Sequence, residues 1–340
     1  MTNQSVLMTA PGEIQIVEAP MPVRKEGEAL LELLYGGLCG SDLGAYRGTY
    51  AYAKYPNVPG HEFSAKVVEI GENEAGLRSG DIVTANPYFN CGTCYSCRRG
   101  LVNCCVDNQT MGVQRAGAYS RFITMPVERL YPVGKLEPKL AALVEPFAIG
   151  YHGVQQAMIQ PDDRVLVVGA GTIGIFTMLA AKQKGARVYI TDVAEEKLRI
   201  AQKMGADGVL LNDSPEHFAE QAAQITQGDG FDGALEAVGM PETLQLCLDH
   251  AAHGGHVVVI GISKRHLDLD SNIIQKKELM IRGSRNAQKQ DFLDLIAWVT
   301  ENQQAVATMI TDLYPFTQAA DAFREFAAGA ATKLKVMLQF

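Results

Sequence analysis

Apolar residues before residue 138 come in short runs that glycine and proline separate. Two of these runs cover residues 29–35 and 64–70, and residues 80–84 have the composition of a turn that leads into a third. Such runs are typical of short β-strands joined by turns. The first part of the chain is therefore predicted to be rich in strands, with few helix signals before residues 138–145.

The pattern changes further along the chain. Residues 164–168 form an apolar, β-branched run that is typical of a strand buried on both faces. Strand-like and helix-like stretches then alternate, which predicts a parallel, doubly wound sheet. The helix-like stretches are residues 175–184 and 195–204, and the strand-like ones are residues 188–191, 208–211, 233–236, 257–260 and 279–282. An amphipathic helix over about residues 289–303 and a strand over residues 333–340 are predicted to rejoin the first domain.

The composition is that of a globular protein with about two domains. Of its 340 residues, 47% are hydrophobic and 20% are charged. The net charge of −8 argues against nucleic acid or an anionic membrane as a partner. The chain opens without a basic region followed by an apolar run, and it has no apolar segment long enough to span a membrane, so we expect a soluble, cytoplasmic protein.

Most of the cysteines lie in one short segment. Cys91, Cys94 and Cys97 are followed by the pair Cys104 and Cys105. Two residues between cysteines let a turn present both sulfurs to one ion, so four of these thiolates can bind a tetrahedral Zn²⁺. Disulfides are the alternative, but within this segment they would close very tight loops. A structural zinc site is therefore predicted, and thiolates kept for a metal suit a reducing cytoplasm.

A glycine-rich turn follows the first buried run. Gly169, Gly171 and Gly174 match the pattern G-x-G-x-x-G between a strand and a helix, with Thr172 and Ile173 inside it. The first glycine allows a tight turn, the second a close backbone approach, and the third close helix packing. A pyrophosphate would then lie on the N–H groups at the helix start. An ordinary glycine turn is the alternative.

Asp192 ends the next predicted strand. Its carboxylate can accept hydrogen bonds from both hydroxyls of an adenosine ribose and would repel a 2′-phosphate, so NAD is predicted rather than NADP. Lys197, one helical turn further on, could reach a ribose hydroxyl or a phosphate. A lysine on a helix surface is equally often solvated.

Several motifs follow one another in an order that resembles a known enzyme family. They are Cys39-Gly-Ser41-Asp42, Pro59-Gly60-His61-Glu62, Gly80-Asp81-x-Val83, the cysteine segment, Glu145-Pro146 and the glycine turn. The chain resembles the zinc-dependent medium-chain alcohol dehydrogenases, in their sorbitol and threonine dehydrogenase-like branch, along essentially its whole length. Within that branch it is similar to bacterial members of the L-galactonate dehydrogenase-like and starvation-sensing type, partly through Ser284-Arg285-Asn286.

The resemblance implies an α/β fold of two domains. A β-rich, GroES-like catalytic domain would comprise residues 1–148 and 289–340, with a structural zinc lobe at about residues 88–108. A doubly wound, parallel-sheet Rossmann domain that binds NAD would comprise residues 149–288. The family also implies a homodimer or homotetramer, in which the last strands of the nucleotide domains pair.

A second, catalytic zinc is also implied by the resemblance. Cys39 and His61 would hold it, with Glu62 and Glu145 as carboxylate ligands or close neighbours, and either carboxylate could bind directly. Two zinc ions per chain are therefore expected. For the structural ion, the family's spacing leaves Cys104 aside and selects Cys91, Cys94, Cys97 and Cys105.

Other residues take possible roles from the same resemblance. Ser41 resembles the hydroxyl that passes the alcohol proton outward, although a serine here could equally cap the loop. Many relatives have a histidine where Gly44 stands, so the proton would leave through water, a ribose hydroxyl or Tyr46.

Arg285 and Asn286, which follow the last predicted strand of the sheet, have possible roles near the nicotinamide. Asn286 could hydrogen-bond the cofactor, and Arg285 could receive a substrate carboxylate bidentately. A surface arginine is an equal alternative for Arg285, and Arg115 is a further candidate.

The predicted function is therefore that of an NAD-linked zinc dehydrogenase. Its substrate would be a secondary alcohol of a sugar acid or polyol, deprotonated with the help of zinc before hydride passes to NAD. An aldonate such as L-galactonate or L-gulonate is the specific expectation. The alternatives are a hexitol, pentitol or short-diol dehydrogenase with the same metal, and a catalytically silent, nucleotide-binding regulatory protein. The presence of Cys39, His61, Glu62 and Glu145 together argues against the silent protein.

Overall fold

The chain folds into two compact units in a computed structural model that describes residues 2–50, 52–263, 265–329 and 332–340. The first unit comprises Met1–Glu145 and Gln288–Phe340, and the second comprises Pro146–Ala287. The sequence placed the ends of the second unit at residues 149 and 288. The observed limits lie three residues and one residue before these positions, and helix α4 (Val144–Gln156) spans the first of them.

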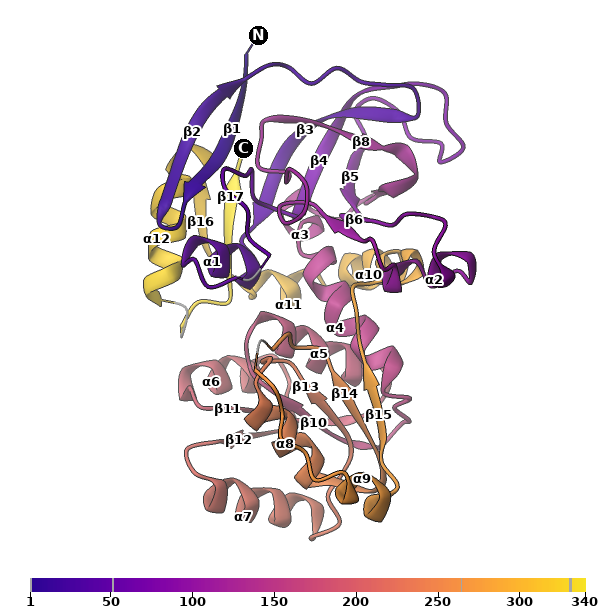
Figure 1. The fold of residues 1–340 in the computed structure, drawn as a ribbon, viewed down its shortest axis with the longest axis vertical. Coiled ribbons are helices and arrows are strands. Elements are labelled where there is room, and N and C mark those ends of the chain that lie inside the picture. Colours follow the sequence, from indigo (N-terminus) through magenta and orange to yellow (C-terminus); the bar gives the residue numbers. More distant parts are fainter. Residues whose placement is uncertain (1, 51, 264, 330–331) are drawn as a thin grey trace. The chain divides into compact units, whose positions relative to one another are not determined.

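A seven-stranded, largely antiparallel sheet forms the centre of the first unit (Figure 1). Its strands lie in the order β16-β17-β3-β4-β5-β9, and β8 also pairs with β3. The strand bounds are β3 (Glu28–Gly37), β4 (Glu62–Ile70), β5 (Ile82–Ala85), β8 (Phe122–Pro126), β9 (Leu130–Pro132), β16 (Ile310–Pro315) and β17 (Lys335–Gln339). Two small sheets are formed by β1 (Asn3–Ala10) with β2 (Glu13–Ala19), and by β6 (Tyr88–Phe89) with β7 (Gln109–Thr110). The prediction of a β-rich first part is confirmed.

Short helices connect these strands. They are α1 (Gly40–Tyr46), α2 (Tyr95–Arg98), α3 (Pro138–Ala141), α10 (Lys289–Glu301), α11 (Gln303–Ala307) and α12 (Ala319–Gly329), with 3₁₀ turns η1 (Val102–Cys104), η2 (Val127–Arg129) and η3 (Phe316–Gln318). The helix predicted over residues 138–145 is interrupted after α3. There the N–H of Leu143 donates to the carbonyl of Leu140, three residues back, which tightens the chain into a turn.

The second unit contains an open sheet of six parallel strands in the order β12-β11-β10-β13-β14-β15. Their bounds are β10 (Arg164–Val168), β11 (Arg187–Asp192), β12 (Gly208–Leu211), β13 (Phe231–Glu236), β14 (Ala251–Val259) and β15 (Met280–Gly283). Helices α5 (Thr172–Gln183), α6 (Glu195–Lys203), α7 (Pro215–Thr226), α8 (Pro241–His250) and α9 (Asn272–Lys277) connect them (Figure 1). The predicted doubly wound sheet is confirmed.

The strand order places β10 in the middle of this sheet. The chain passes from β10 outward to β12 and then returns to β13, on the other side of β10. The side chains of Val165, Leu166 and Val167 in β10 are fully buried, as predicted for this run. A reversal of strand order of this kind leaves a crevice at the carboxyl ends of the strands, where open α/β sheets bind ligands.

In the described part of the chain, no helix is both long and apolar enough to cross a membrane.

Candidate active site and metal centres

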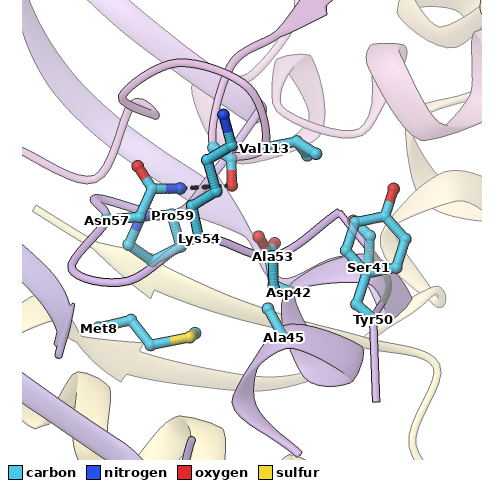
Figure 2. Close-up of a pocket in the computed structure, with 11 residues that line it drawn as sticks. Met8, Ser41, Asp42, Ala45, Tyr50, Ala53, Lys54, Asn57, Pro59 and Val113 are labelled. Carbon is cyan, nitrogen blue, oxygen red and sulfur yellow. Dashed lines mark hydrogen bonds between the residues drawn. The ribbon is translucent and has the colours of Figure 1, made fainter. Parts of the chain in front are cut away.

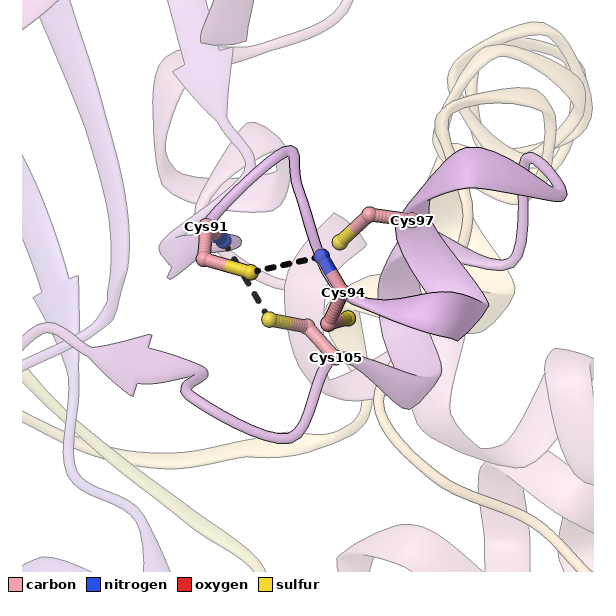
Figure 3. Close-up of side chains that lie close together, drawn as sticks. All are labelled: Cys91, Cys94, Cys97 and Cys105. Atoms are coloured by element: carbon pink, nitrogen blue, oxygen red, sulfur yellow. Dashed lines mark hydrogen bonds between the residues drawn. The ribbon is translucent and has the colours of Figure 1, made fainter.

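Four cysteines of the first unit converge on one point. The sulfur atoms of Cys91, Cys94, Cys97 and Cys105 all lie within 4.8 Å of one another, and Figure 3 shows them turned towards a common centre. Cys94 precedes the short helix α2, Cys97 lies in it, and Cys105 follows η1. Four thiolates in this arrangement match the ligand set of a structural zinc ion. Cys104 is exposed and does not belong to the group.

Backbone N–H groups donate to two sulfur atoms of this cluster. Cys91 N donates to the sulfur of Cys105 at 3.2 Å, and Cys94 N donates to the sulfur of Cys91 at 3.4 Å. The N–H groups of Thr93 and Cys94 lower the pKa of Cys91 to about 6. Donors that stabilise the thiolate also favour metal binding, which requires the deprotonated form.

A second group of ligand atoms lies at the start of β4 and α1. The sulfur of Cys39, a ring nitrogen of His61 and a carboxylate oxygen of Glu62 lie within 4.8 Å of one another. The backbone N–H of Cys39 donates to the carboxylate of Asp42 at 3.0 Å, which fixes the start of α1. His61 is buried, and its Nδ1 has no hydrogen-bond partner among the described residues. A thiolate, an imidazole and a carboxylate form a donor set that suits zinc.

Glycine before His61 allows this geometry. Gly60 has a φ of +99°, and a side chain at this position would collide with the ring of Tyr119. The hydroxyl of Tyr119 donates to the carbonyl of Gly37 at 2.5 Å. The backbone therefore turns tightly into His61 against a buried ring that is itself anchored in β3.

Glu62 forms a buried ion pair that the sequence analysis missed. Lys335 Nζ lies 2.6 and 2.8 Å from the two carboxylate oxygens of Glu62. Burial would lower the pKa of Lys335, but the Glu62 carboxylate holds it above its ordinary value, so the lysine stays charged. The available signal was Lys335 itself, a charged residue directly before the apolar run Val336-Met337-Leu338 of the final strand.

Glu145 has a different partner, which the sequence analysis also missed. The hydroxyl of Tyr88 donates to Glu145 Oε1, and both side chains are buried. Burial raises the pKa of Glu145 to about 7, and the neighbouring Glu62 adds to the rise while His61 opposes it. Burial would lower the pKa of His61, but Cys39 and the nearby carboxylates hold it well above its ordinary value. Glu145 is therefore close enough to influence His61 and Glu62, but it does not belong to the group of Cys39, His61 and Glu62 whose ligand atoms lie within 4.8 Å of one another.

Ser41 borders a small cavity. Ser41, Asp42 and Tyr50 line this cavity of about 10 Å³, which has room for about one water molecule (Figure 2). Burial, with a contribution from Cys39, raises the pKa of Tyr50 to about 12. The ring of Tyr46 instead packs against Phe323, with 5.5 Å between ring centroids.

The glycine turn of the second unit joins β10 to α5. Gly169 has a φ of +103°, and a side chain on Gly174 would collide with the carbonyl oxygen of Gly169. Gly171 has open space where a side chain would point. Thr172 and Ile173 form the first turn of α5. Gly169 and Gly174 therefore leave no room for a side chain, whereas the open space at Gly171 lets a ligand approach the backbone closely.

Asp192 lies beside this turn, at the end of β11. One carboxylate oxygen accepts a hydrogen bond from Ala170 N at 2.8 Å, and the other accepts from Ala194 N at 3.0 Å. Lys197 is half-buried in the first turn of α6. The carboxylate of Asp192 is thus held next to the glycine turn.

Three further candidates lie elsewhere. Arg285 is exposed and Asn286 half-buried after β15, where Asn286 has a φ of +51°. Arg115, in the first unit, stacks on the ring of Phe89 with 3.6 Å from its guanidinium carbon to the ring centroid.

Comparison with known proteins covers both units. Residues 25–135 match the alcohol dehydrogenase GroES-like domain, and residues 172–301 match the zinc-binding dehydrogenase family. The chain is 32% identical to L-galactonate-5-dehydrogenase of Escherichia coli K12 over 342 residues, which covers 100% of both chains.

Solved structures agree over the same length. The Escherichia coli CFT073 RspB protein, described as an alcohol dehydrogenase complexed with NADH, is 29% identical with a TM-score of 0.92 and covers 100% of this chain and 99% of its own. L-idonate 5-dehydrogenase of Escherichia coli K-12 is 27% identical with a TM-score of 0.87 and covers 100% of this chain and 99% of its own. The α/β fold with a GroES-like domain and a Rossmann-type sheet is therefore confirmed, and this chain belongs to the zinc-binding alcohol dehydrogenase family of oxidoreductases.

Proposed function

We propose that this protein is an NAD-dependent zinc dehydrogenase that oxidises a secondary alcohol of a sugar acid. The observation that carries the proposal is the group of Cys39, His61 and Glu62, whose ligand atoms lie within 4.8 Å of one another. Cys39 and His61 would hold the ion, and Glu62 or Glu145 would supply a carboxylate beside it. Zinc bound there would lower the pKa of an alcohol hydroxyl towards neutrality.

Residues of the first unit would then handle the proton. Ser41 Oγ is proposed to accept it and to pass it to a water molecule in the adjoining cavity, since Gly44 carries no side chain that could do so. Tyr50 lines the same cavity, and its high pKa keeps its hydroxyl protonated at neutral pH. Tyr50 can therefore donate a hydrogen bond to that water but cannot act as the base.

The second unit would bind the cofactor, which accepts the hydride. The N–H groups at the start of α5, after Gly171, would bind the pyrophosphate, and Asp192 would accept hydrogen bonds from the adenosine ribose. Lys197 is proposed to reach the same ribose or a phosphate, and Asn286 to hydrogen-bond the nicotinamide. No basic residue stands directly after Asp192 to attract a 2′-phosphate, which supports NAD over NADP.

An aldonate such as L-galactonate or L-gulonate is the proposed substrate. Two of the relatives are named for oxidation of L-galactonate and L-idonate, which are both sugar acids. Arg285 is proposed to receive the carboxylate through its guanidinium group.

Metal content and cofactor reduction test the proposal together. We expect two zinc ions per chain, one after Cys39→Ser, and two after the matched control Cys104→Ser. NAD reduction should be fastest with aldonates in a panel that also contains hexitols, pentitols and short diols. A protein whose zinc content and turnover survive Cys39→Ser would contradict the catalytic site, whereas a clear preference for neutral polyols would contradict only the substrate.

We also propose that the protein forms a homodimer or homotetramer through β15. This strand lies at the edge of the six-stranded sheet, and its four residues are all exposed. An unpaired, exposed edge is a template for pairing with the same strand of a second copy. Light scattering, which measures the molar mass of the protein in solution, tests this assembly.

A further inference from the structure

Glu236 is a buried carboxylate to which neither the sequence analysis nor the proposed reaction assigns a role. It is the last residue of β13, and it is 1% exposed. Its Oε1 accepts hydrogen bonds from Val238 N at 2.8 Å, Gly239 N at 2.8 Å and the hydroxyl of Thr243 at 2.7 Å. A buried carboxylate is costly unless hydrogen-bond donors satisfy it, and here three donors do so. Conversely, these donors need an acceptor at this position.

The carboxylate organises two loops that follow neighbouring strands. The backbone carbonyl of Glu236 accepts hydrogen bonds from Ile260 N at 2.9 Å and Gly261 N at 3.1 Å. A side chain on Gly239 would lie 2.6 Å from the carbonyl oxygen of Ile262, and one on Gly261 would lie 2.5 Å from Glu236 Oε2. The segment after β13 and the segment after β14 are therefore packed backbone against backbone, with the Glu236 side chain beside both.

This packing places an apolar surface beside the glycine turn. Ala237 N donates to the carbonyl of Val168, the last residue of β10, at 2.9 Å. A side chain on Gly169 would lie 2.6 Å from Val238 Cγ2. Val238 is nevertheless 45% exposed, and Ile262 is 75% exposed. Two exposed apolar side chains thus lie at the carboxyl ends of β13 and β14.

Their position relative to Asp192 indicates which part of a dinucleotide they could meet. Asp192 ends β11, on one side of β10, whereas Glu236 ends β13, on the other side. A dinucleotide lies across the point where the strand order reverses. With its adenosine ribose at Asp192, its other half would extend over the ends of β13 and β14, towards Val238 and Ile262.

We propose that Glu236 is a positioning residue that holds the segment after β13 so that Val238 and Ile262 form an apolar surface for the nicotinamide half of the cofactor. This inference depends on the proposed use of NAD. Glu236 acts through the backbone N–H groups of Val238 and Gly239 and does not touch the cofactor. Without an acceptor, these two donors would be left unpaired, and the segment would shift to find other partners.

Binding measurements with two ligands test the inference. The dissociation constants of NADH and of ADP, which lacks the nicotinamide half, are measured for wild type, Glu236→Ala and the matched control Glu242→Ala. Glu242 is an exposed glutamate at the start of the adjoining helix α8. We expect Glu236→Ala to weaken NADH binding at least about tenfold and ADP binding less than about twofold. Glu236→Gln, which keeps one oxygen acceptor, should recover part of the NADH affinity.

Each other outcome has a distinct meaning. Equal weakening of NADH and ADP binding would overturn the positioning role, because it would show that Glu236 only stabilises the second unit as a whole. Unchanged NADH binding would overturn it directly. A wild-type protein that binds ADP but not NADH would contradict the proposed use of NAD itself. If Glu236→Ala does not fold, Val238→Ala and Ile262→Ala decide the question, since both should weaken NADH and spare ADP, and unchanged NADH binding in both would end the proposal.

Discussion

The buried ion pair between Lys335 and Glu62 leads to a quantitative prediction about stability. Lys335 Nζ lies 2.6 and 2.8 Å from the carboxylate oxygens and also donates to the carbonyl of Leu38 at 3.2 Å. The side chains of Lys335 and Glu62 are 3% and 1% exposed. The substitution Lys335→Met keeps most of the aliphatic volume but leaves a buried carboxylate without its counter-charge.

The expected loss follows from that unpaired charge. Removing one partner of a buried ion pair costs about 3–5 kcal/mol of unfolding free energy, because the remaining charge stays desolvated. A zinc ion near Glu62 would offset part of the charge, so we expect a loss of about 3 kcal/mol. With a urea dependence of about 2 kcal/mol per molar, the unfolding midpoint would fall by about 1.5 M.

A matched control separates burial from ion pairing as such. Lys333 Nζ lies 2.7 Å from Asp312, but these side chains are 18% and 24% exposed. Lys333→Met should therefore cost about 1 kcal/mol or less. The two variants remove similar ion pairs from the same part of the chain and differ mainly in the solvent exposure of the pair.

Fluorescence during urea unfolding measures both variants. Trp298 is the single tryptophan of the chain and lies in α10, within the same unit as Lys335. The double variant Lys335→Met/Glu62→Gln should recover most of the loss, since it leaves no buried charge. Equal midpoints for Lys335→Met and Lys333→Met would refute the reasoning, and so would additive losses in the double variant.

Three further predictions concern the two units separately. Asp192→Ala should weaken NAD binding by about tenfold to a hundredfold, because the proposed hydrogen bonds from the ribose and the one that Ala170 N donates are both lost. It should also narrow the gap to NADP, because the repulsion of a 2′-phosphate is lost; an unchanged cofactor preference in steady-state kinetics would contradict this. Cys105→Ser should remove one zinc ion per chain while Cys104→Ser keeps both, as metal analysis would show. Lys277→Met should cost about 1–2 kcal/mol, because Lys277 Nζ donates to three carbonyls at the end of α8; an unchanged thermal unfolding curve would count against that role.

Features that depend on nearby residues could be derived from the sequence. The spacing of Cys91, Cys94 and Cys97 is a local property, since one turn presents all three sulfurs to the same side. Gly169 and Gly174 are also separated by a single turn, so their steric role can be read from a strand and a helix on either side. The alternation of strands and helices after residue 164 predicted the parallel sheet for a similar reason, because one helix connects each pair of consecutive strands from β10 to β15.

Contacts between distant segments were decided by the tertiary structure. Lys335 and Glu62 are 273 residues apart, and they meet because β17 and β4 flank β3, where Gly37 is paired with both Met337 and Glu62. The register of a sheet is set by the whole hydrophobic pattern and by the turns, so no local motif predicts such a pair. Glu236 is a similar case. The donors to its side chain follow within a few residues, but its proposed role depends on β10 and β14, which lie on either side of β13. Sequence alone therefore determined the ligand types and the turns that present them, whereas only the folded sheets decided which buried charges neutralise one another.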